Sequence, residues 1–284
     1  MLVLWRREMN STTILYMRGL VITDTGILLG SVLTLTPIAC ADYLQTEALS
    51  HFKHLVYPAL RTPAYYVVMT LQQINVWITV SVSVERYVAI CHPFRAARLI
   101  TRRNTVRVML AIAAASLLYN LPRVFAYRTV DCDAAGAAGG GGNGSSGCLD
   151  VITTEFGQTD LYNFYRTIMY LIIIYVLPFL CLLVLNGFLL RELMSMQRRK
   201  AATSSKEENE ANLSLVLVLI VVVFLFCQTP GLISQFDLIH FSLFIPWLGF
   251  SNFLFATNSA VNFLIYTAFG RKFRRVLLRV FRHI

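Results

Sequence analysis

The stretch Glu85–Pro93, with the sequence ERYVAICHP, follows a long apolar segment and decides how the chain is interpreted. Its first three residues, Glu85, Arg86 and Tyr87, place two opposite charges and an aromatic ring where that segment ends. An arginine here can serve simply as an anchor, because its aliphatic stem lies along apolar surroundings while the guanidinium reaches the lipid headgroups. By itself, therefore, the stretch predicts the edge of a membrane-spanning helix.

The segments on either side have the composition of a membrane protein. Of the 284 residues, 56% are hydrophobic and 14% are charged, and the mean hydropathy is +0.61. A soluble domain carries about 25% charged residues. About 20 apolar residues cross a bilayer as a helix, and lipid offers no partner to a loose backbone polar group. We therefore predict an all-α membrane protein with six complete spans, at 11–38, 56–90, 104–125, 162–190, 212–236 and 246–268.

The charges indicate which side of the membrane is cytoplasmic. A net charge of +10 can signal nucleic-acid binding, but Lys and Arg cluster in short segments between the apolar blocks. Five of the 25 basic residues fall on one side of the predicted bundle: Lys53, Arg61, Arg123, Arg128 and Arg166. Cytoplasmic loops carry the excess of Lys and Arg. We therefore expect the segments around 1–10, 91–107, 191–210 and 269–284 to face the cytoplasm, and we expect no nucleic-acid partner.

Further motifs extend the pattern over nearly the whole chain. ERYVAICHP resembles the signature that closes the third span of rhodopsin-like G-protein-coupled receptors. Asp24 resembles the aspartate of the second span, and Pro178 the proline of the fifth. FLFCQTP at 224–230 resembles the sixth-span motif with Gln for Trp, and Asn258-Ser259 with NFLIY at 262–266 resembles the seventh-span motif with Phe for Pro. The resemblance implies a rhodopsin-like seven-helix bundle.

The two ends of the chain are interpreted through the same resemblance. Residues 1–10 resemble the end of the first span and the first cytoplasmic loop, so most of the first span is missing. Residues 269–284 resemble the surface helix, and the basic run 271–282 carries a Val, Leu and Phe stripe typical of a helix lying on a membrane. The expected bundle therefore comprises residues 11–268.

Other details resemble the invertebrate FMRFamide-type neuropeptide receptors. They are NLPR at 120–123, Cys227-Gln228 before Pro230, and Leu185-Asn186. The resemblance implies a plasma-membrane receptor for an extracellular, amidated neuropeptide. Its partners would be the lipid bilayer, a heterotrimeric G protein and arrestin.

The resemblance also assigns roles to residues of the inner half. Arg86 would pair with Glu85 and, at rest, with Glu210 of the sixth span. Activation would release Arg86, swing the sixth helix outward about Pro230, and bring Tyr266 inward, because a proline removes a helix hydrogen bond and provides a pivot. The G-protein switch would then comprise Glu85, Arg86, Tyr87, Glu210 and Tyr266. Transmission would involve Val76, Pro178, Phe224, Gln228 and Pro230.

Asp24 is a carboxylate inside an apolar span, which is costly without partners and so marks a functional-site hypothesis. The resemblance places Asn75, Asn258, Ser259 and Asn262 around it. Such oxygen ligands suit a hard cation, and a sodium ion is the expected allosteric ligand, with no other cofactor. The alternative is a neutral, protonated Asp24 in a polar network.

The ligand-binding residues are expected among neutral amides. Amine receptors carry an Asp where this chain has Val68, and opsins carry a Lys where it has Ala256. Amides can hydrogen-bond a peptide backbone or an amidated C-terminus without needing charge. The alternative is that they pack between helices. The candidates are Gln72, Tyr170, Gln228, Gln235 and Asn252.

Cysteines and a sequon mark the outer side. The family's bridge starts from a third-span Cys, and Arg61 occupies that position here. Cys132 and Cys148 can pair across a Gly-rich segment, or Cys40 can pair with either, and the sequence does not choose. Asn143 is the one sequon expected outside. The cysteines show no zinc-type pair spacing, so we expect no metal site.

Two other kinds of function compete with a signalling receptor. A truncated product that does not signal fits the missing first span. A transporter would show internal repeats with broken helices in matching halves, and the sequence contains no such repeat. The chain also lacks a Ser/His/Asp pattern, a metal pair and a phosphate loop, so we expect no enzyme.

Overall fold

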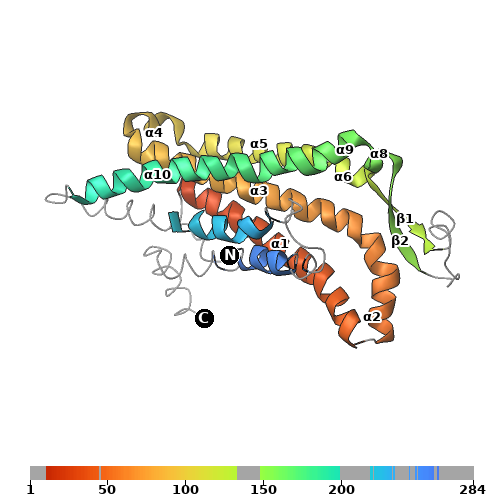
Figure 1. The fold of residues 1–284 in the computed structure, drawn as a ribbon. Coiled ribbons are helices and arrows are strands. Elements are labelled where there is room, and N and C mark those ends of the chain that lie inside the picture. The colour runs from red at the N-terminus through yellow and green to blue at the C-terminus, as the bar shows by residue number, and fades with distance from the viewer. Residues whose placement is uncertain are drawn as a thin grey trace. The chain divides into compact units, whose positions relative to one another are not determined.

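The computed structural model of the chain is mainly helical (Figure 1). It describes residues 11–44, 46–132, 148–198, 218–219, 221–231, 233, 243, 247, 249–258 and 261. Predictions about 1–10 and 269–284 lie outside these residues.

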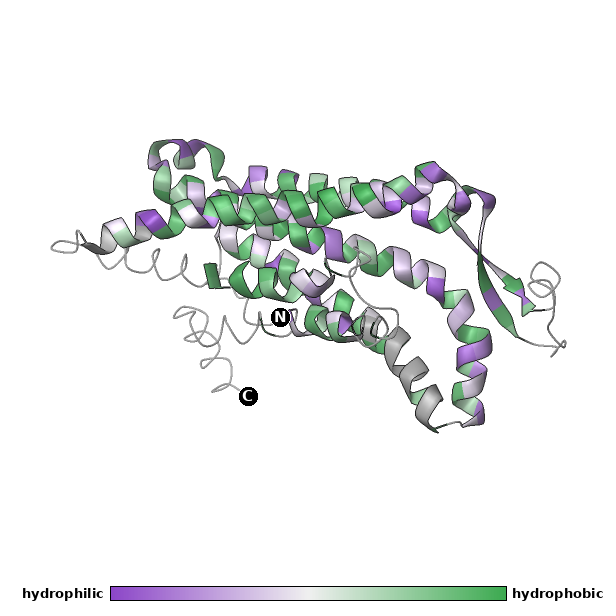
Figure 2. Cartoon of the chain, viewed as in Figure 1, coloured by the Kyte–Doolittle hydropathy of each residue, from purple (hydrophilic) through white to green (hydrophobic). Residues whose placement is uncertain are grey.

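Four long helical segments contain four of the predicted spans. They are α1 (Thr12–Leu44); α2 (Glu47–His51) continuing through the π-helix η1 (Phe52–Val56) into α3 (Tyr57–Cys91); α5 (Arg102–Asn120) with α6 (Pro122–Phe125); and α9 (Asp160–Phe164) continuing through η2 (Tyr165–Met169) and η3 (Leu171–Val176) into α10 (Leu177–Arg198). Within the described residues, each contains a stretch long and apolar enough to cross a membrane. Hydrophobic residues cover most of α10 (Figure 2).

The helix bounds differ from the predicted spans in two places. Helix α1 extends to Leu44, beyond the predicted end at 38, and α2 with η1 adds helix from Glu47 before the predicted start at 56. In the predicted span 212–236, Val221–Gly231 forms a shorter apolar helix, and 249–258 is helical in the predicted span 246–268. The described residues therefore show four full-length candidates and leave the predicted count of six as an expectation.

A proline explains one irregularity of the fifth predicted span. Pro178 is the second residue of α10, just after η3, and a proline has no N–H to donate to the carbonyl four residues earlier, which belongs to Ile174. The wider π turns of η3 accommodate this missing bond, as helix irregularities commonly do beside a proline. Pro178 is itself fully buried, so the irregular turn belongs to a packed part of the helix.

A two-stranded antiparallel hairpin is added to the helices, between the predicted spans 104–125 and 162–190, where no strand was predicted. Strand β1 (Tyr127–Asp131) pairs with β2 (Leu149–Thr153), in register from Tyr127 opposite Thr153 to Asp131 opposite Leu149. Figure 1 shows this hairpin leading away from α6 and α8 (Glu155–Gln158). Its β-branched residues suit a strand. The fold therefore departs from the all-α expectation here.

The described residues form two compact units. The first comprises those within 1–24, 74–113 and 171–284, and the second those within 25–73 and 114–170. In the first unit, a Cβ on Gly19 of α1 would lie 2.6 Å from Met109 Cε and 3.0 Å from Ile78 Cδ1. In the second, a Cβ on Gly26 would lie 2.6 Å from Leu71 Cδ1. Both glycines let α1 pack closely, as small residues do between membrane helices.

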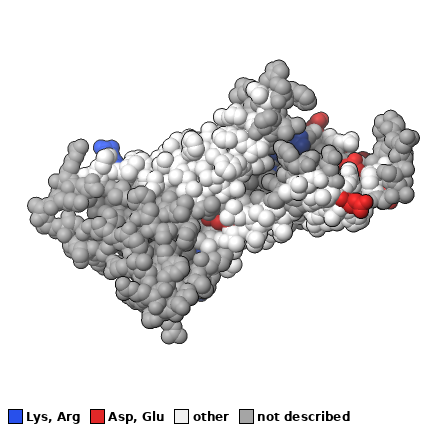
Figure 3. All heavy atoms as spheres, turned by 90° about the horizontal axis from the view of Figure 1, so that it is seen from below, with Lys and Arg blue, Asp and Glu red and all other residues white. Residues whose placement is uncertain are grey.

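The surface is poor in charge, as a membrane protein requires. On the face shown in Figure 3, most described atoms belong to uncharged residues, and Lys, Arg, Asp and Glu gather in a few small places. Large exposed apolar side chains are common on the helices; examples are Leu110, Leu118 and Leu180. In water, molecules with such a surface would associate with one another. In a bilayer, the same side chains can contact the lipid chains favourably.

Candidate functional site

The Glu85–Arg86 pair lies buried near the C-terminal end of α3. Glu85 Oε1 accepts hydrogen bonds from Thr12 Oγ1 at 2.9 Å and Thr13 Oγ1 at 2.7 Å, both on the first turn of α1. Arg86 Nη2 lies 3.5 Å from the same oxygen. The buried carboxylate therefore has a cation and two hydroxyl donors, which is what a buried charge requires. Sequence analysis paired Glu85 with Arg86 but did not foresee Thr12 and Thr13.

Tyr87, the third residue of the motif, packs among aromatic rings. Its ring lies 5.4 Å from that of His92 and 6.1 Å from that of Phe188 on α10. The Tyr87 hydroxyl and His92 Nε2 lie 3.3 Å apart, within hydrogen-bond distance. Glu210 and Tyr266, the other predicted switch residues, lie outside the described residues.

Asp24 and Asn75 form a second buried polar group in the first unit. Asn75 Nδ2 donates to Asp24 Oδ1 at 2.7 Å and to Thr23 Oγ1 at 2.9 Å, which brings together the two residues that the resemblance placed side by side. Asn258 is also buried, and its Oδ1 accepts no hydrogen bond from the described part of the chain. Ser259 and Asn262 lie outside that part.

These oxygens are of the kind that a small hard cation prefers. The Asp24 carboxylate would supply the charge, and Asn258 Oδ1 is a further buried neutral oxygen in the same unit. Among the residues that the structure describes, no group of three or more His, Cys, Asp or Glu side chains could hold a transition metal. The sodium ion at Asp24 stays a prediction.

Two of the predicted transmission residues, Phe224 and Gln228, lie where η3 and α10 meet the helix 221–231. Val76, Pro178 and Phe224 are buried. Gln228 and Phe224 line a cavity of about 20 Å³ with Ile174, Tyr175, Phe179, Leu225 and Thr229. The Gln228 Oε1 atom has no hydrogen-bond partner among the described residues.

Pro230 interrupts the hydrogen bonds of its helix, because it has no N–H for the Phe226 carbonyl. The Pro230 carbonyl accepts a hydrogen bond from Trp247 Nε1 at 3.0 Å, and Thr229 Oγ1 donates to the Leu225 carbonyl at 2.7 Å. Side chains thus bond the backbone on either side of the proline. This local geometry is that of a helix with a weak point, which suits a pivot.

The second unit contains a buried arginine that the predictions did not select. Arg123 of α6 is 1% exposed. Its Nη1 donates to the Tyr65 hydroxyl at 2.7 Å and its Nε to Asn120 Oδ1 at 3.0 Å. Asn120 Nδ2 in turn donates to Gln73 Oε1 at 2.7 Å and to the Ser116 carbonyl at 2.9 Å. These bonds connect α3 with α5 and α6.

Aromatic rings complete the surroundings of Arg123. Its guanidinium carbon lies 5.0 Å from the centre of the Tyr170 ring, 5.3 Å from that of Tyr65 and 5.6 Å from that of Tyr165. Cations are attracted to such ring faces. No acidic side chain of the described residues forms a salt bridge with Arg123. A charge near the end of an apolar span is costly without partners, and that argument could have identified Arg123 from the sequence.

The predicted ligand-binding residues fall in both units. In the second unit, Gln72 is buried with its Nε2 unpartnered among the described residues, and the Tyr170 hydroxyl lies 3.6 Å from Met69 Sδ. In the first unit are Gln228 and the half-buried Asn252. Gln235 lies outside the described residues.

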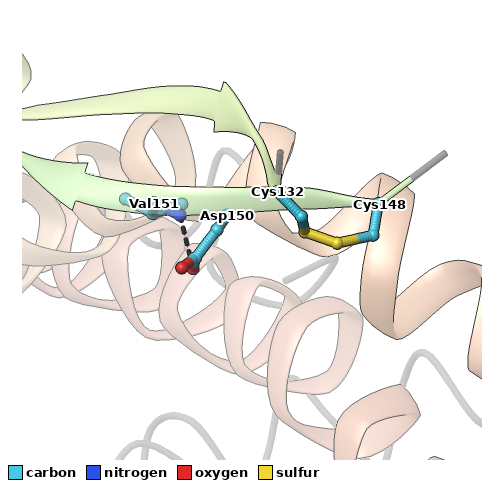
Figure 4. The surroundings of a disulfide bond; sticks show 4 residues. All are labelled: Cys132, Cys148, Asp150 and Val151. Carbon is cyan, nitrogen blue, oxygen red and sulfur yellow. Dashed lines mark hydrogen bonds between the residues drawn. A yellow bond between two sulfur atoms is a disulfide. The ribbon is translucent and has the colours of Figure 1, made fainter. Parts of the chain in front are cut away.

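The hairpin carries the disulfide bond. The structure joins Cys132 to Cys148 just beyond the last strand pair, with the two Cα atoms 5.5 Å apart, and Cys40 is a free thiol (Figure 4). Nearby, Asp150 Oδ1 accepts from the Val151 N–H at 2.7 Å. Thr129 Oγ1 donates to the Pro58 carbonyl at 3.2 Å, near the start of α3, where the family's bridge would begin. Asn143 lies outside the described residues.

Long apolar helices with a buried acid–arginine pair and an intramembrane Asp–Asn pair define a membrane receptor of the rhodopsin type. A family model described as "7 transmembrane receptor (rhodopsin family)" matches residues 1–266. The chain belongs to this family. Its members are receptors, which agrees with the expectation of a non-enzyme and disfavours the transporter alternative.

The individual relatives are neuropeptide receptors. The chain is 30% identical to the "FMRFamide receptor" of Drosophila melanogaster over 282 residues, which cover 99% of this chain and 50% of that receptor. It is 26% identical over 230 residues to the "FMRFamide peptide receptor frpr-18" of Caenorhabditis elegans, covering 77% and 51%. It is 27% identical over 214 residues to the "Neuromedin-U receptor 2" of Rattus norvegicus, covering 70% and 51%. The chain spans about half the length of these relatives.

Proposed function

We propose that this chain is a receptor for an extracellular amidated neuropeptide and activates a heterotrimeric G protein. The observation that carries the proposal is the buried Glu85–Arg86 pair, with its two threonine donors, in a chain similar to FMRFamide receptors. A buried ion pair with extra partners can hold one arrangement and release another, which is the property of a switch.

Unpartnered amides support a peptide as the ligand. In the first unit, Gln228 Oε1 is a buried acceptor without a partner among the described residues, and it lines the cavity beside Phe224. In the second unit, Gln72 Nε2 is a buried donor that likewise has no described partner. An unmade hydrogen bond costs about 1–3 kcal/mol in a buried site. A peptide backbone or a terminal carboxamide offers both a donor and an acceptor, so it could satisfy either amide and recover that free energy.

The proposed coupling surface lies just beyond the switch. Helix α4 (Pro93–Leu99) follows His92, and its Phe94 is 97% exposed, with the exposed Arg95 beside it. A fully exposed aromatic residue is a typical anchor in a partner's pocket. We propose that α4 contacts the G protein when the helix 221–231 swings outward about Pro230, and that arrestin uses the same face. The basic loops then face the cytoplasm of a plasma-membrane receptor.

The test is a nucleotide-exchange assay on the full chain in nanodiscs with purified heterotrimeric G proteins. A panel of peptides, each made with an amidated and a free-acid C-terminus, is added at increasing concentration. We expect at least one amidated peptide to accelerate exchange and its free acid to be weaker. If correctly inserted chain accelerates exchange on none of the G proteins with any amidated peptide of the panel, the proposed function is wrong.

A further inference from the structure

The turn of the helix 221–231 that contains Pro230 is bonded to a segment further along the chain. Trp247 Nε1 donates to the Pro230 carbonyl at 3.0 Å, which is the usual length of an N–H···O hydrogen bond. The two residues are 17 positions apart and belong to the same compact unit. Sequence analysis selected Pro230 as a pivot but did not select Trp247.

A second contact lies at the residue after the proline. A Cβ on Gly231 would lie 2.5 Å from Phe255 Cζ and 3.0 Å from Phe255 Cε2, so a side chain at this position would require the ring to move. Small residues allow such a close approach between membrane helices. Pro230 and Gly231 therefore both contact residues within 247–258.

Trp247 is itself held by its own segment. Ser251 Oγ donates to the Trp247 carbonyl at 2.9 Å, and Ser251 is buried. The ring centres of Trp247 and Phe250 lie 6.0 Å apart, a distance typical of packed aromatic pairs. The carbonyl and the ring of Trp247 therefore each have a partner, which restricts the directions in which the indole N–H can point.

These contacts determine which side of the proline bend can move. Pro230 removes the hydrogen bond to the Phe226 carbonyl, and a helix bends most easily at such a point. In a hinge motion one part moves while the other stays in place. The Trp247 bond ends on the Pro230 carbonyl and the Gly231 contact follows it, so both hold the C-terminal side of the bend. The part before Pro230, which includes Phe224, is left to move.

We infer that Trp247 is a positioning residue for the proposed switch. It fixes the Pro230 turn, so that the outward swing takes place in the part of the helix before the proline. Trp247 acts through Pro230 and contacts neither the peptide nor the G protein. This role rests on the proposed receptor function, whereas the anchoring of the Pro230 turn can be measured without it.

The anchoring is tested by hydrogen exchange on the full chain in nanodiscs, without peptide or G protein. Trp247→Phe keeps an aromatic ring and removes the indole N–H. The loss of one hydrogen bond should make the amides between 224 and 231 exchange roughly fivefold faster. The amides of α5 should exchange as they do in the unaltered chain.

The positioning role is tested on the same preparation with peptide and purified heterotrimeric G protein. In Trp247→Phe, peptide affinity measured without G protein should stay near that of the unaltered chain. Maximal stimulated nucleotide exchange, per mole of peptide-binding chain, should fall roughly fivefold. A residue that contacted the peptide would instead lower the affinity, and one that only stabilised the fold would lower the amount of peptide-binding chain.

A conservative variant separates the hydrogen bond from the bulk of the ring. In Trp247→His, Nε2 of the imidazole occupies the same place in its five-membered ring as Nε1 of the indole, and it donates when protonated. This variant should retain more stimulated exchange than Trp247→Phe. The matched control is Thr257→Val, because the Thr257 hydroxyl donates to the Phe253 carbonyl at 2.8 Å within the same segment. Both readouts should be unaltered in this control.

Unaltered hydrogen exchange between 224 and 231 in Trp247→Phe overturns the anchoring. Unaltered stimulated exchange in Trp247→Phe, or an equal loss in Trp247→Phe and Trp247→His, overturns the positioning role. If no peptide stimulates the unaltered chain, the proposed receptor function has failed, while hydrogen exchange still decides whether Trp247 anchors the Pro230 turn. The two failures are therefore distinguishable.

Discussion

At the residue scale, Glu85 has the contacts that the proposed switch would need. One oxygen, Oε1, is shared by Thr12, Thr13 and Arg86. Charge-assisted hydrogen bonds are about twice as strong as neutral ones, and an exposed version of the same pair would contribute little. The two threonines therefore stabilise the arrangement in which Glu85 is charged and next to Arg86.

Removing the threonine hydroxyls should loosen this arrangement. Thr12→Val/Thr13→Val keeps side-chain size and removes both donors, each of which contributes about 1.5–3 kcal/mol to a charged acceptor. We expect basal nucleotide exchange to rise severalfold at equal surface expression. The control is Thr70→Val, since Thr70 is a buried threonine whose hydroxyl donates to the Tyr66 carbonyl. Unchanged basal exchange in the double variant would show that the threonines do not hold the switch.

Asp24 allows a second prediction at the same scale. Its carboxylate accepts from Asn75 and provides the charge that a sodium ion would need. Asp24→Asn keeps the shape and removes the charge, so we expect the sodium dependence of peptide affinity to disappear. Peptide binding is measured at increasing sodium concentration, with potassium at the same concentrations as the control cation. Persistence of the dependence would place the ion elsewhere or leave Asp24 in a purely structural polar network.

At the element scale, Arg123 connects segments that are far apart in the sequence. It contacts Tyr65 of α3, Asn120 of α5, and Tyr165 and Tyr170 of the fifth predicted span. Replacing a buried charge can be harmless when all its partners are replaced as well. Here the Tyr65 hydroxyl and Asn120 Oδ1 would remain buried without their hydrogen bonds to Arg123. The loss of Arg123 should therefore lower the stability of the folded chain.

Arg123→Leu is therefore expected to destabilise the chain by about 3–5 kcal/mol. The fall in thermal stability in detergent, with reduced surface expression, measures the effect. The melting temperature of Arg123→Lys should lie between those of the unaltered chain and Arg123→Leu. Lysine keeps a cation for the rings but lacks the guanidinium fork that bonds Tyr65 and Asn120. An Arg123→Leu melting temperature equal to that of the unaltered chain would show that the cluster contributes no net stability.

The disulfide bond of the hairpin allows a further prediction at this scale. The Cys132–Cys148 bond has a sequence separation of 16 and encloses a Gly-rich segment that favours an open chain. A closed loop of about 15 residues gains about 3 kcal/mol from the bond. In Cys132→Ser/Cys148→Ser we expect faster hydrogen exchange at the amides of β1 and β2.

The amides of α5 serve as the internal control for that experiment, because this helix has its own backbone hydrogen bonds. Their exchange should be unaltered by the cysteine substitutions. If β1 and β2 remain as protected as before, the strand pairing is independent of the bond, and the Thr129–Pro58 contact near α3 becomes the better explanation for its stability.

The elements that the sequence predicted are those with a strong local signal. The apolar blocks within α1, α3, α5 and α10 follow from composition alone. The hairpin was missed because pairing of 127–131 with 149–153 is non-local and crosses a Gly-rich segment. The residues of α2 and η1, EALSHFKHLV, carry charges and histidines that weaken an apolar signal. A hydrophobic period of 3.6 residues does not distinguish π turns from α-helical turns.

At the scale of the whole molecule, the two polar groups of the first unit were more predictable than the Arg123 group of the second. Glu85–Arg86 and Asp24–Asn75 follow from motifs whose residues stand at known places on their helices. The Arg123 cluster depends on three tyrosines, at 65, 165 and 170, which only tertiary packing brings to one guanidinium. The two threonines at Glu85 were unforeseen for the same reason.

The central claim is that peptide binding reaches the G protein through Arg86. The most direct measurement compares the unaltered chain with Arg86→Ala, recording peptide affinity and peptide-stimulated nucleotide exchange on the same nanodisc preparation. The account predicts that Arg86→Ala binds the peptide and has lost most stimulated exchange. Stimulated exchange that survives at full rate in Arg86→Ala would contradict it.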